Sequence, residues 1–176
     1  MDKYKFIKKI GIGSYGSIYL VQNINNNEYS AMKELDITLT STKEKHMIIN
    51  EIIIGFFHNC PYIIKYEDVF FKDNKIYLKM KYCKQGNLKK YLEKNKNLNN
   101  QKNDIIRKVL YGVQYLHYNK IIHRDIKSDN ILMHNNNPYL ADFGTCCILE
   151  DFEYFDKTCI GTPYYLSPRS EQHTSE

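Results

Sequence analysis

The hydrophobic residues in the first half of the chain come in short alternating runs, the pattern of β-strands with one buried face. One longer segment, residues 42–57, instead carries apolar residues at helical spacing, and Ser41 or Thr42 is placed to cap it. This half is therefore expected to form a small, mostly antiparallel sheet with one helix. The predicted strands are two within residues 4–21, on either side of a glycine cluster, and then residues 29–35, 66–71 and 76–82, the last two joined by a turn at Asp73–Asn74.

Beyond Gly86 the pattern changes from alternation to helical spacing. Residues 88–94 and 103–118 are predicted as helices, and the asparagine- and lysine-rich residues between them as a solvated loop. The second half is therefore expected to be helical, which makes the chain an α+β protein of two lobes. The apolar stripe of the longer helix is predicted to consist of Ile105, Ile106, Val109, Val113 and Leu116.

Composition argues against several classes of protein. With 176 residues, 43% of them hydrophobic and 26% charged, the chain is long enough for one substantial domain and too mixed to be disordered throughout. No apolar run approaches the roughly 20 residues that cross a bilayer. The N-terminus lacks both a secretion signal and the glycine at position 2 that myristoylation requires, so an intracellular protein without membrane insertion is expected.

Cysteine usage and charge point to no metal cluster and no nucleic-acid partner. The five cysteines include no C-x-x-C pair, a pattern that fits neither a disulfide framework nor a zinc site. The net charge of +5 comes mainly from lysines scattered over the whole length, whereas nucleic-acid binders gather such residues on one face.

A glycine-rich loop, G-x-G-x-x-G over residues 11–16, lies between the first two predicted strands. Such a loop lets backbone N–H groups approach phosphate oxygens without obstruction by Cβ atoms. The same pattern opens dinucleotide-binding folds, and Asp36 lies 20 residues after Gly16, where those folds place a ribose-binding acid. That alternative requires a helix directly after the glycines, yet residues 17–21 have the β-branched and aromatic content of a strand.

Lys33 on the third predicted strand is a candidate to contact nucleotide phosphates. A lone lysine is usually a solvated charge, but a glutamate on the following helix could form an ion pair that holds it in place. Glu51 and Glu44 both lie on that helix, and the spacing favours Glu51.

The strongest chemical pattern is HRDIKSDN at residues 123–130, followed by DFG at residues 142–144. Phosphoryl transfer needs a carboxylate near the attacking hydroxyl and oxygen ligands for Mg²⁺. Asp125, Asn130 and Asp142 supply those groups. A merely solvated polar loop would leave unexplained why they occur in order with the glycine loop, Lys33 and Glu51.

The order and spacing of GIGSYG, AMK, the helix with Glu51, HRDIKSDN, DFG and GTPYYLSP resemble the eukaryotic protein kinases over residues 4–168. The resemblance implies a two-lobe fold, with a sheet and one helix in an N-lobe of residues 4–82 and a partial helical C-lobe of residues 83–168. It also implies ATP and Mg²⁺ as cofactors and a protein with serine or threonine hydroxyls as the partner. IGTPYYLSP and KTCIGT are similar to the NIMA-related kinases in particular.

By this resemblance each functional residue has an expected role. Asp125 is the catalytic base, Lys127 neutralises charge on the transferred phosphoryl group, and Lys33 with Glu51 sets the active geometry. Asn130 and Asp142 are the Mg²⁺ ligands. Met80 guards the back of the adenine pocket, and the backbone of residues 81–83 holds the adenine. The residues expected to contact ATP are Ile10, Gly11, Ile12, Gly13, Ser14, Tyr15, Gly16, Ser17, Ile18, Ala31, Lys33, Met80, Tyr82, Cys83 and Leu132.

The resemblance also implies two roles for threonines after the DFG motif. Thr158 is expected to be an activating phosphosite, because Arg124 beside the catalytic aspartate could pair with its phosphate. Thr162 is expected to bond near Asp125 and Lys127 and to hold the substrate loop.

The sequence departs from the kinase pattern at its end. The family continues from S-P-E into further helices, whereas this chain has S-P-R and an atypical tail over residues 169–176. A C-terminally truncated domain is therefore expected, with an exposed apolar underside that favours instability or aggregation. The alternative function is a catalytically weak or inactive nucleotide-binding module.

A second departure is Gly55, one helical turn after Glu51, where the family usually has a bulky residue stacking towards Phe143. Glycine is expected to leave a gap there and to weaken the helix by about 1 kcal/mol relative to alanine. The neighbouring Ile54 or Phe56 is expected to fill the gap; otherwise the inward position of the helix is less favoured.

Overall fold

A computed structural model describes residues 1–13, 16–38, 41–98 and 101–149. Its first half is a five-stranded antiparallel sheet in the order β1-β2-β3-β5-β4. Each strand lies within two residues of its prediction, and both turn residues at Asp73–Asn74 have positive φ, as a tight hairpin turn requires. The strands are β1 (Tyr4–Gly13), β2 (Gly16–Asn23), β3 (Tyr29–Asp36), β4 (Tyr66–Lys72) and β5 (Lys75–Lys81).

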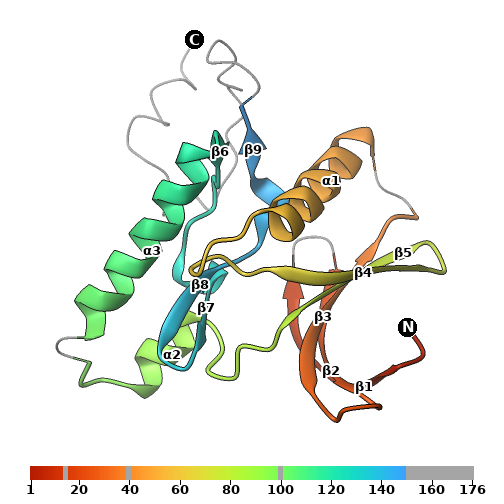
Figure 1. Cartoon of the computed structure of the whole chain (residues 1–176), viewed down its shortest axis with the longest axis horizontal. Coiled ribbons are helices and arrows are strands. Elements are labelled where there is room, and N and C mark those ends of the chain that lie inside the picture. The colour runs from red at the N-terminus through yellow and green to blue at the C-terminus, as the bar shows by residue number, and fades with distance from the viewer. Residues whose placement is uncertain (14–15, 39–40, 99–100, 150–176) are drawn as a thin grey trace.

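One helix, α1 (Thr42–Phe57), lies beside this sheet, with the bounds that the sequence predicted (Figure 1). Of the two candidate caps, Ser41 is the one used: its side chain accepts the backbone N–H of Glu44, and the Glu44 carboxylate accepts the backbone N–H of Ser41 at 2.7 Å. These bonds from Ser41 lower the pKa of Glu44. Glu44 therefore acts at the helix terminus and not at the phosphate site.

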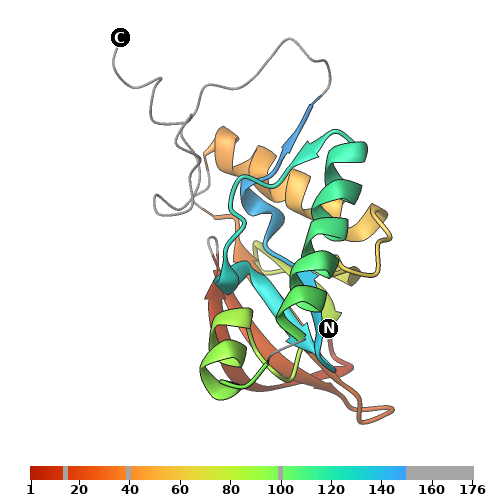
Figure 2. The same ribbon diagram turned by 90° about the vertical axis from the view of Figure 1, so that its left-hand side faces the viewer.

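The second half contains α2 (Leu88–Lys94), with the predicted bounds, and α3 (Gln101–Tyr118), which begins two residues earlier than predicted. It also contains four short strands that the periodicity did not reveal, because two to four residues are too few to show an alternation. They pair as β7 (Ile131–His134) with β8 (Asn137–Leu140), and as β6 (Ile121–Ile122) with β9 (Cys147–Ile148). Both views show α3 running along these strands (Figures 1 and 2).

The packing face of α3 differs in part from the predicted stripe. Ile105 and Leu116 are buried, but Ile106 is 56% exposed, so its assignment to the stripe was wrong. Close packing occurs instead at Gly112, where a Cβ atom would lie 2.9 Å from Leu140. In the loop before α3, Leu98 is buried although the whole loop was predicted to be solvated.

One hydrophobic core joins the two halves, running from Leu35 in the sheet through Tyr66 to Phe143. The connection after α1 belongs to this junction, because the Ile64 N–H donates to the Leu140 carbonyl at 2.8 Å. The Leu140 N–H in turn donates to the carbonyl of Tyr62, also at 2.8 Å. The DFG segment and α1 are thereby held against each other. Among the described residues, no helix is both long and apolar enough to span a membrane.

Candidate active site

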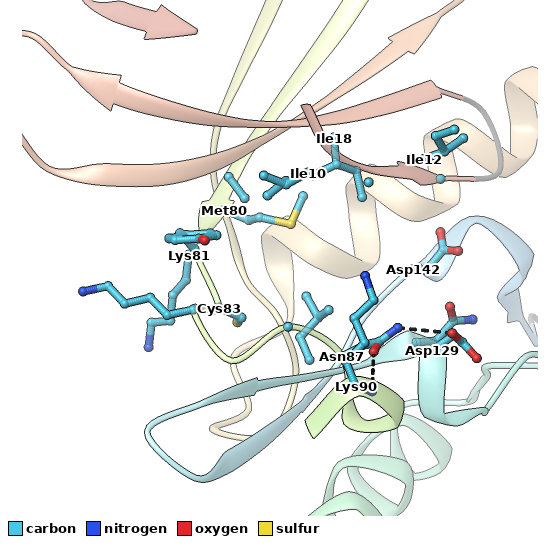
Figure 3. Close-up of a pocket in the computed structure, with 18 of the residues that line it drawn as sticks. Ile10, Ile12, Ile18, Met80, Lys81, Cys83, Asn87, Lys90, Asp129 and Asp142 are labelled. Atoms are coloured by element: carbon cyan, nitrogen blue, oxygen red, sulfur yellow. Dashed lines mark hydrogen bonds between the residues drawn. The ribbon is translucent and has the colours of Figure 1, made fainter. Parts of the chain in front are cut away.

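A cavity of about 730 Å³ lies between the sheet and the segment that contains α2 and residues 127–130 (Figure 3). The side chains of Ile10, Ile18 and Ala31 come from the sheet, and Leu132 comes from β7 on the other side. Such an apolar slot with polar groups at one end suits a planar base joined to a charged tail. The predicted ATP contacts that line it are Ile10, Gly11, Ile12, Gly13, Ile18, Ala31, Met80, Tyr82, Cys83 and Leu132.

Two predicted contacts in the glycine-rich segment have another structural role. Gly16 and Ser17 pair with β3, and a Cβ atom on Gly16 would lie 1.7 Å from the Glu34 carbonyl oxygen, so only glycine fits that register. Neither residue is among those that line the cavity. Ser14 and Tyr15 lie outside the described residues. Since β2 follows the glycines directly, the helix that a dinucleotide-binding fold requires is not there, and that alternative is ruled out.

Lys33 is the centre of a buried ion-pair network. Its ammonium, 3% exposed, pairs with the Glu51 carboxylate and with Asp142 Oδ1 at 3.0 Å. Burial opposes the charge on Lys33, but the two carboxylates outweigh it, and the pKa of Lys33 is raised. The lysine is therefore a fixed cation, and the choice of Glu51 over Glu44 as its partner is confirmed.

Tyr66 occupies the space that Gly55 was expected to leave empty. A Cβ atom on Gly55 would lie 2.5 Å from Tyr66 Cδ2, and Phe56 is exposed, so the expectation of a gap filled from the helix was wrong. The Tyr66 hydroxyl donates to Glu51 Oε1 at 2.6 Å, and its ring lies 6.4 Å from that of Phe143. Burial, followed by the Glu51 charge, raises the pKa of Tyr66 well above its usual value. The phenol therefore keeps its proton and remains the hydrogen-bond donor to Glu51.

Replacing Tyr66 by phenylalanine is expected to lower the free energy of unfolding by about 1–2 kcal/mol, because a buried carboxylate oxygen loses a donor. Urea denaturation followed by circular dichroism would measure the change. Tyr4→Phe is the matched control, since Tyr4 is also buried and its hydroxyl has no hydrogen-bond partner among the described residues. An equal loss in both variants would contradict the importance of the bond to Glu51.

The loop of residues 123–130 gathers the second set of predicted side chains. Asn130 Nδ2 donates to Asp125 Oδ2 at 2.8 Å and to the Asp125 carbonyl at 2.9 Å. Lys127 Nζ lies 2.8 Å from the same carboxylate oxygen. His123 packs beneath the buried side of this loop, with Nε2 3.2 Å from the Ala141 carbonyl oxygen. Burial lowers the pKa of His123. Asp125 is thus oriented by two neighbours that its own loop supplies.

The donor set suits a hard cation such as Mg²⁺. Asn130 uses its amide nitrogen on Asp125, which leaves its amide oxygen for a cation, and Asp142 adds a carboxylate at the edge of the same cavity. Mg²⁺ prefers oxygen ligands and is often bound by one or two protein groups together with phosphates and waters. In the part of the chain that the structure describes, no three His, Cys, Asp or Glu side chains cluster to hold a metal by themselves. The residues therefore fit a metal that arrives with a nucleotide.

Several residues that line the cavity were not predicted from the sequence. They come from the segment between β5 and α2, from α2 itself and from the loop of residues 123–130. The local signal that could have identified the first of these groups is the asparagine cap of α2. Cys83, which was predicted, is buried, and burial raises its pKa to about 11, so a neutral thiol faces the cavity. The lining residues that were not predicted are Lys84, Gly86, Asn87, Lys90 and Asp129. Lys127, Asn130 and Asp142, which were predicted as catalytic or metal-binding residues, also line the cavity.

The predicted phosphosite Thr158 and the predicted loop-holding Thr162 lie outside the described residues. Within them, Arg124 Nε donates to the Thr145 carbonyl at 2.7 Å. This bond fixes the arginine beside the segment that follows DFG.

The sequence matches the protein kinase domain over residues 4–175. It is 35% identical over 172 residues to the serine/threonine-protein kinase Nek1 of Mus musculus and 34% identical over 173 residues to Nek5 of the same species. Both alignments cover 96% of this chain, but only 14% and 27% of the relatives. It is also 34% identical to the serine/threonine-protein kinase shk1/pak1 of Schizosaccharomyces pombe, over 94% of this chain and 25% of that protein.

Proposed function

Because this chain belongs to the protein kinase domain family, with NIMA-related kinases among its relatives, we propose that it transfers the γ-phosphoryl group of MgATP to serine or threonine hydroxyls of proteins. One observation carries the proposal. Side chains far apart in the sequence converge beside one cavity: Lys33 joins Glu51 to Asp142, and Asn130 holds Asp125. Asp142 and Asn130 line the cavity, and the other three are bonded to them directly or through Lys33.

In the proposed reaction, the hydroxyl oxygen of the substrate attacks the γ-phosphorus as Asp125 accepts the hydroxyl proton. The bond between the γ-phosphorus and the bridging oxygen breaks, and ADP leaves. Lys127, 2.8 Å from the Asp125 carboxylate, neutralises charge on the transferred group. Lys33 orients the other phosphates, and Glu51 keeps Lys33 in place.

When bound, Mg²⁺ neutralises the negative charge that develops on the phosphate oxygens. Asn130 and Asp142 are the residues proposed to hold it. The αL backbone of Asp142, with φ of 64°, directs this residue away from the strand geometry of the preceding segment. Such strain occurs at functional sites.

The division of the chain follows from the same proposal. We assign residues 4–82 to the nucleotide-binding lobe and residues 83–168 to the catalytic lobe, with ATP between them. Thr158 remains the proposed phosphosite and Thr162 the proposed contact to the catalytic loop. The proposed partner is a protein that offers serine or threonine hydroxyls; the scattered lysines do not form the concentrated basic run typical of a nucleic-acid binder.

The direct test measures transfer of labelled γ-phosphate from ATP to two peptide mixtures. One mixture has serine and threonine as the only acceptor residues, and the other has only tyrosine. Transfer to the serine and threonine peptides, abolished by a Mg²⁺ chelator, is the expected result. Binding of ATP should be measured separately by calorimetry. Binding without transfer would indicate a non-catalytic nucleotide-binding module, and transfer to tyrosine alone would contradict the proposed substrate class.

A further inference from the structure

We infer that Lys90 on α2 is a second cation for the phosphate groups of the bound nucleotide, acting together with Lys33. The inference rests on the proposed function, because it assumes that the cavity binds ATP. It adds a nucleotide-binding residue in a helix that the sequence motifs did not identify as part of the site.

The direction of the Lys90 side chain is the first observation. Lys90 lines the cavity, and Figure 3 shows it extending from α2 into the cavity, towards the strands that carry Ile10 and Ile18. Lys81 also lines the cavity, but its ammonium lies 5.0 Å from the centre of the Tyr139 ring and turns away from the interior. An occupant of the cavity would therefore meet the ammonium of Lys90 and not that of Lys81.

The balance of charge is the second observation. The ammonium of Lys33 is paired with carboxylates of the site, and so is that of Lys127. Lys90, by contrast, has no carboxylate partner in the part of the chain that the structure describes. Lys90 is exposed to solvent, but it borders the cavity, and a cation there without a counter-charge attracts an anionic occupant of the cavity.

The position of Lys90 is fixed relative to the catalytic loop. Asn87 caps α2 by accepting the backbone N–H of Lys90 at 3.0 Å, and its Nδ2 donates to Asp129 Oδ1 at 3.1 Å. One side chain thus ties the backbone of Lys90 to the loop that contains Asp125. Gly86 lies close to the lysine stem, since a Cβ atom there would be 3.9 Å from Lys90 Cδ. The backbone that carries the Lys90 ammonium is therefore held in a fixed position relative to the cavity.

The expected ligand chemistry is a polyphosphate. ATP carries several negative charges, whereas adenosine fills the same apolar slot and carries none. If the charge of Lys90 is what matters, replacing it should weaken binding of ATP and leave binding of adenosine unchanged. The effect should also decrease in high salt, because screening in about 0.5 M salt reduces the reach of a charge to on the order of 4 Å.

The experiment compares Lys90→Met with Lys89→Met, the same substitution one residue earlier on α2; both lysines are exposed, but only Lys90 lines the cavity. Calorimetric dissociation constants would be measured for MgATP and for adenosine. We expect about a fivefold weaker binding of MgATP to Lys90→Met, no change for adenosine, wild-type values for Lys89→Met, and recovery in Lys90→Arg.

Each other outcome overturns the inference. Equal loss for ATP and adenosine would assign Lys90 a packing role. Unchanged ATP binding with a raised KM for an acidic peptide would assign it to the protein substrate instead. If the wild-type protein binds adenosine but not ATP, the proposed function itself is wrong. If the wild-type protein and Lys90→Met bind ATP with equal affinity, the proposed function stands and only the role of Lys90 is wrong.

Discussion

Replacing Asp125 by asparagine is expected to lower the rate of phosphoryl transfer by about a thousandfold while leaving the affinity for ATP close to that of the wild type. Asparagine has nearly the same shape, so the bond from Asn130 to the side-chain oxygen can remain. Its amide cannot accept the hydroxyl proton of the substrate. The loss should therefore appear in kcat and not in the binding of nucleotide.

Asp129→Asn is the matched control for this prediction. It is the same substitution in the same loop, and Asp129 also lines the cavity, but its hydrogen bond from Asn87 needs only an acceptor oxygen, which asparagine retains. Single-turnover phosphate transfer would be measured for both variants. If the two lose activity equally, general disturbance of the loop and not the Asp125 carboxylate is responsible.

Replacing Gly55 by leucine is expected to lower the free energy of unfolding by about 3 kcal/mol. The first side-chain atom would already lie 2.5 Å from Tyr66 Cδ2, well inside van der Waals contact. Either α1 moves outward or the Tyr66 ring leaves its place beside Phe143, and both movements disturb the carboxylate of Glu51. Phosphoryl transfer should decrease together with stability.

A second substitution tests this explanation. Tyr66→Ala in the Gly55→Leu background removes the ring that clashes and should recover part of the lost stability, which urea denaturation would detect. Lys45→Leu places the same side chain on the exposed face of α1 and should change stability by no more than about 0.5 kcal/mol. Wild-type stability of Gly55→Leu would show that Tyr66 can move aside without cost.

The parts of the fold that rest on local patterns were predicted well. The helix of residues 42–57 has a regular apolar spacing and a capping box, which are properties of neighbouring residues. The ion pair of Lys33 with Glu51 was also found, because the order of the motifs fixes which strand precedes which helix. Asp125, Asn130 and Asp142 were singled out for the same reason; the structure places Asn130 and Asp142 in the lining of one cavity and bonds Asp125 to Asn130.

The errors concern contacts that depend on tertiary packing. Gly55 looked like a defect because the sequence does not show that Tyr66, 11 residues later on another element, projects into the same space. The pairing of β7 with β8 is too short to produce a visible alternation. In the sequence, Lys90 cannot be distinguished from any other solvated lysine. Hydrophobic periodicity predicts which face of a helix is buried, but it does not show which side chains border a cavity between elements.

The connection that follows α1 anchors only one end of this helix to the second half of the molecule among the described residues. Its C-terminal end continues into residues 62–64, which are hydrogen-bonded to Leu140, while its capped N-terminal end has no such bond to the second half among the described residues. Glu51 lies about 9 Å from Phe57 along the helix and Thr42 about 22 Å, at 1.5 Å per residue. A swing that displaces the Thr42 end by about 5 Å would thus shift Glu51 by only about 2 Å, which is enough to separate its carboxylate from Lys33. A displacement of the Thr42 end would therefore reach Glu51 reduced to less than half, while the end of α1 near Phe57 stays in place.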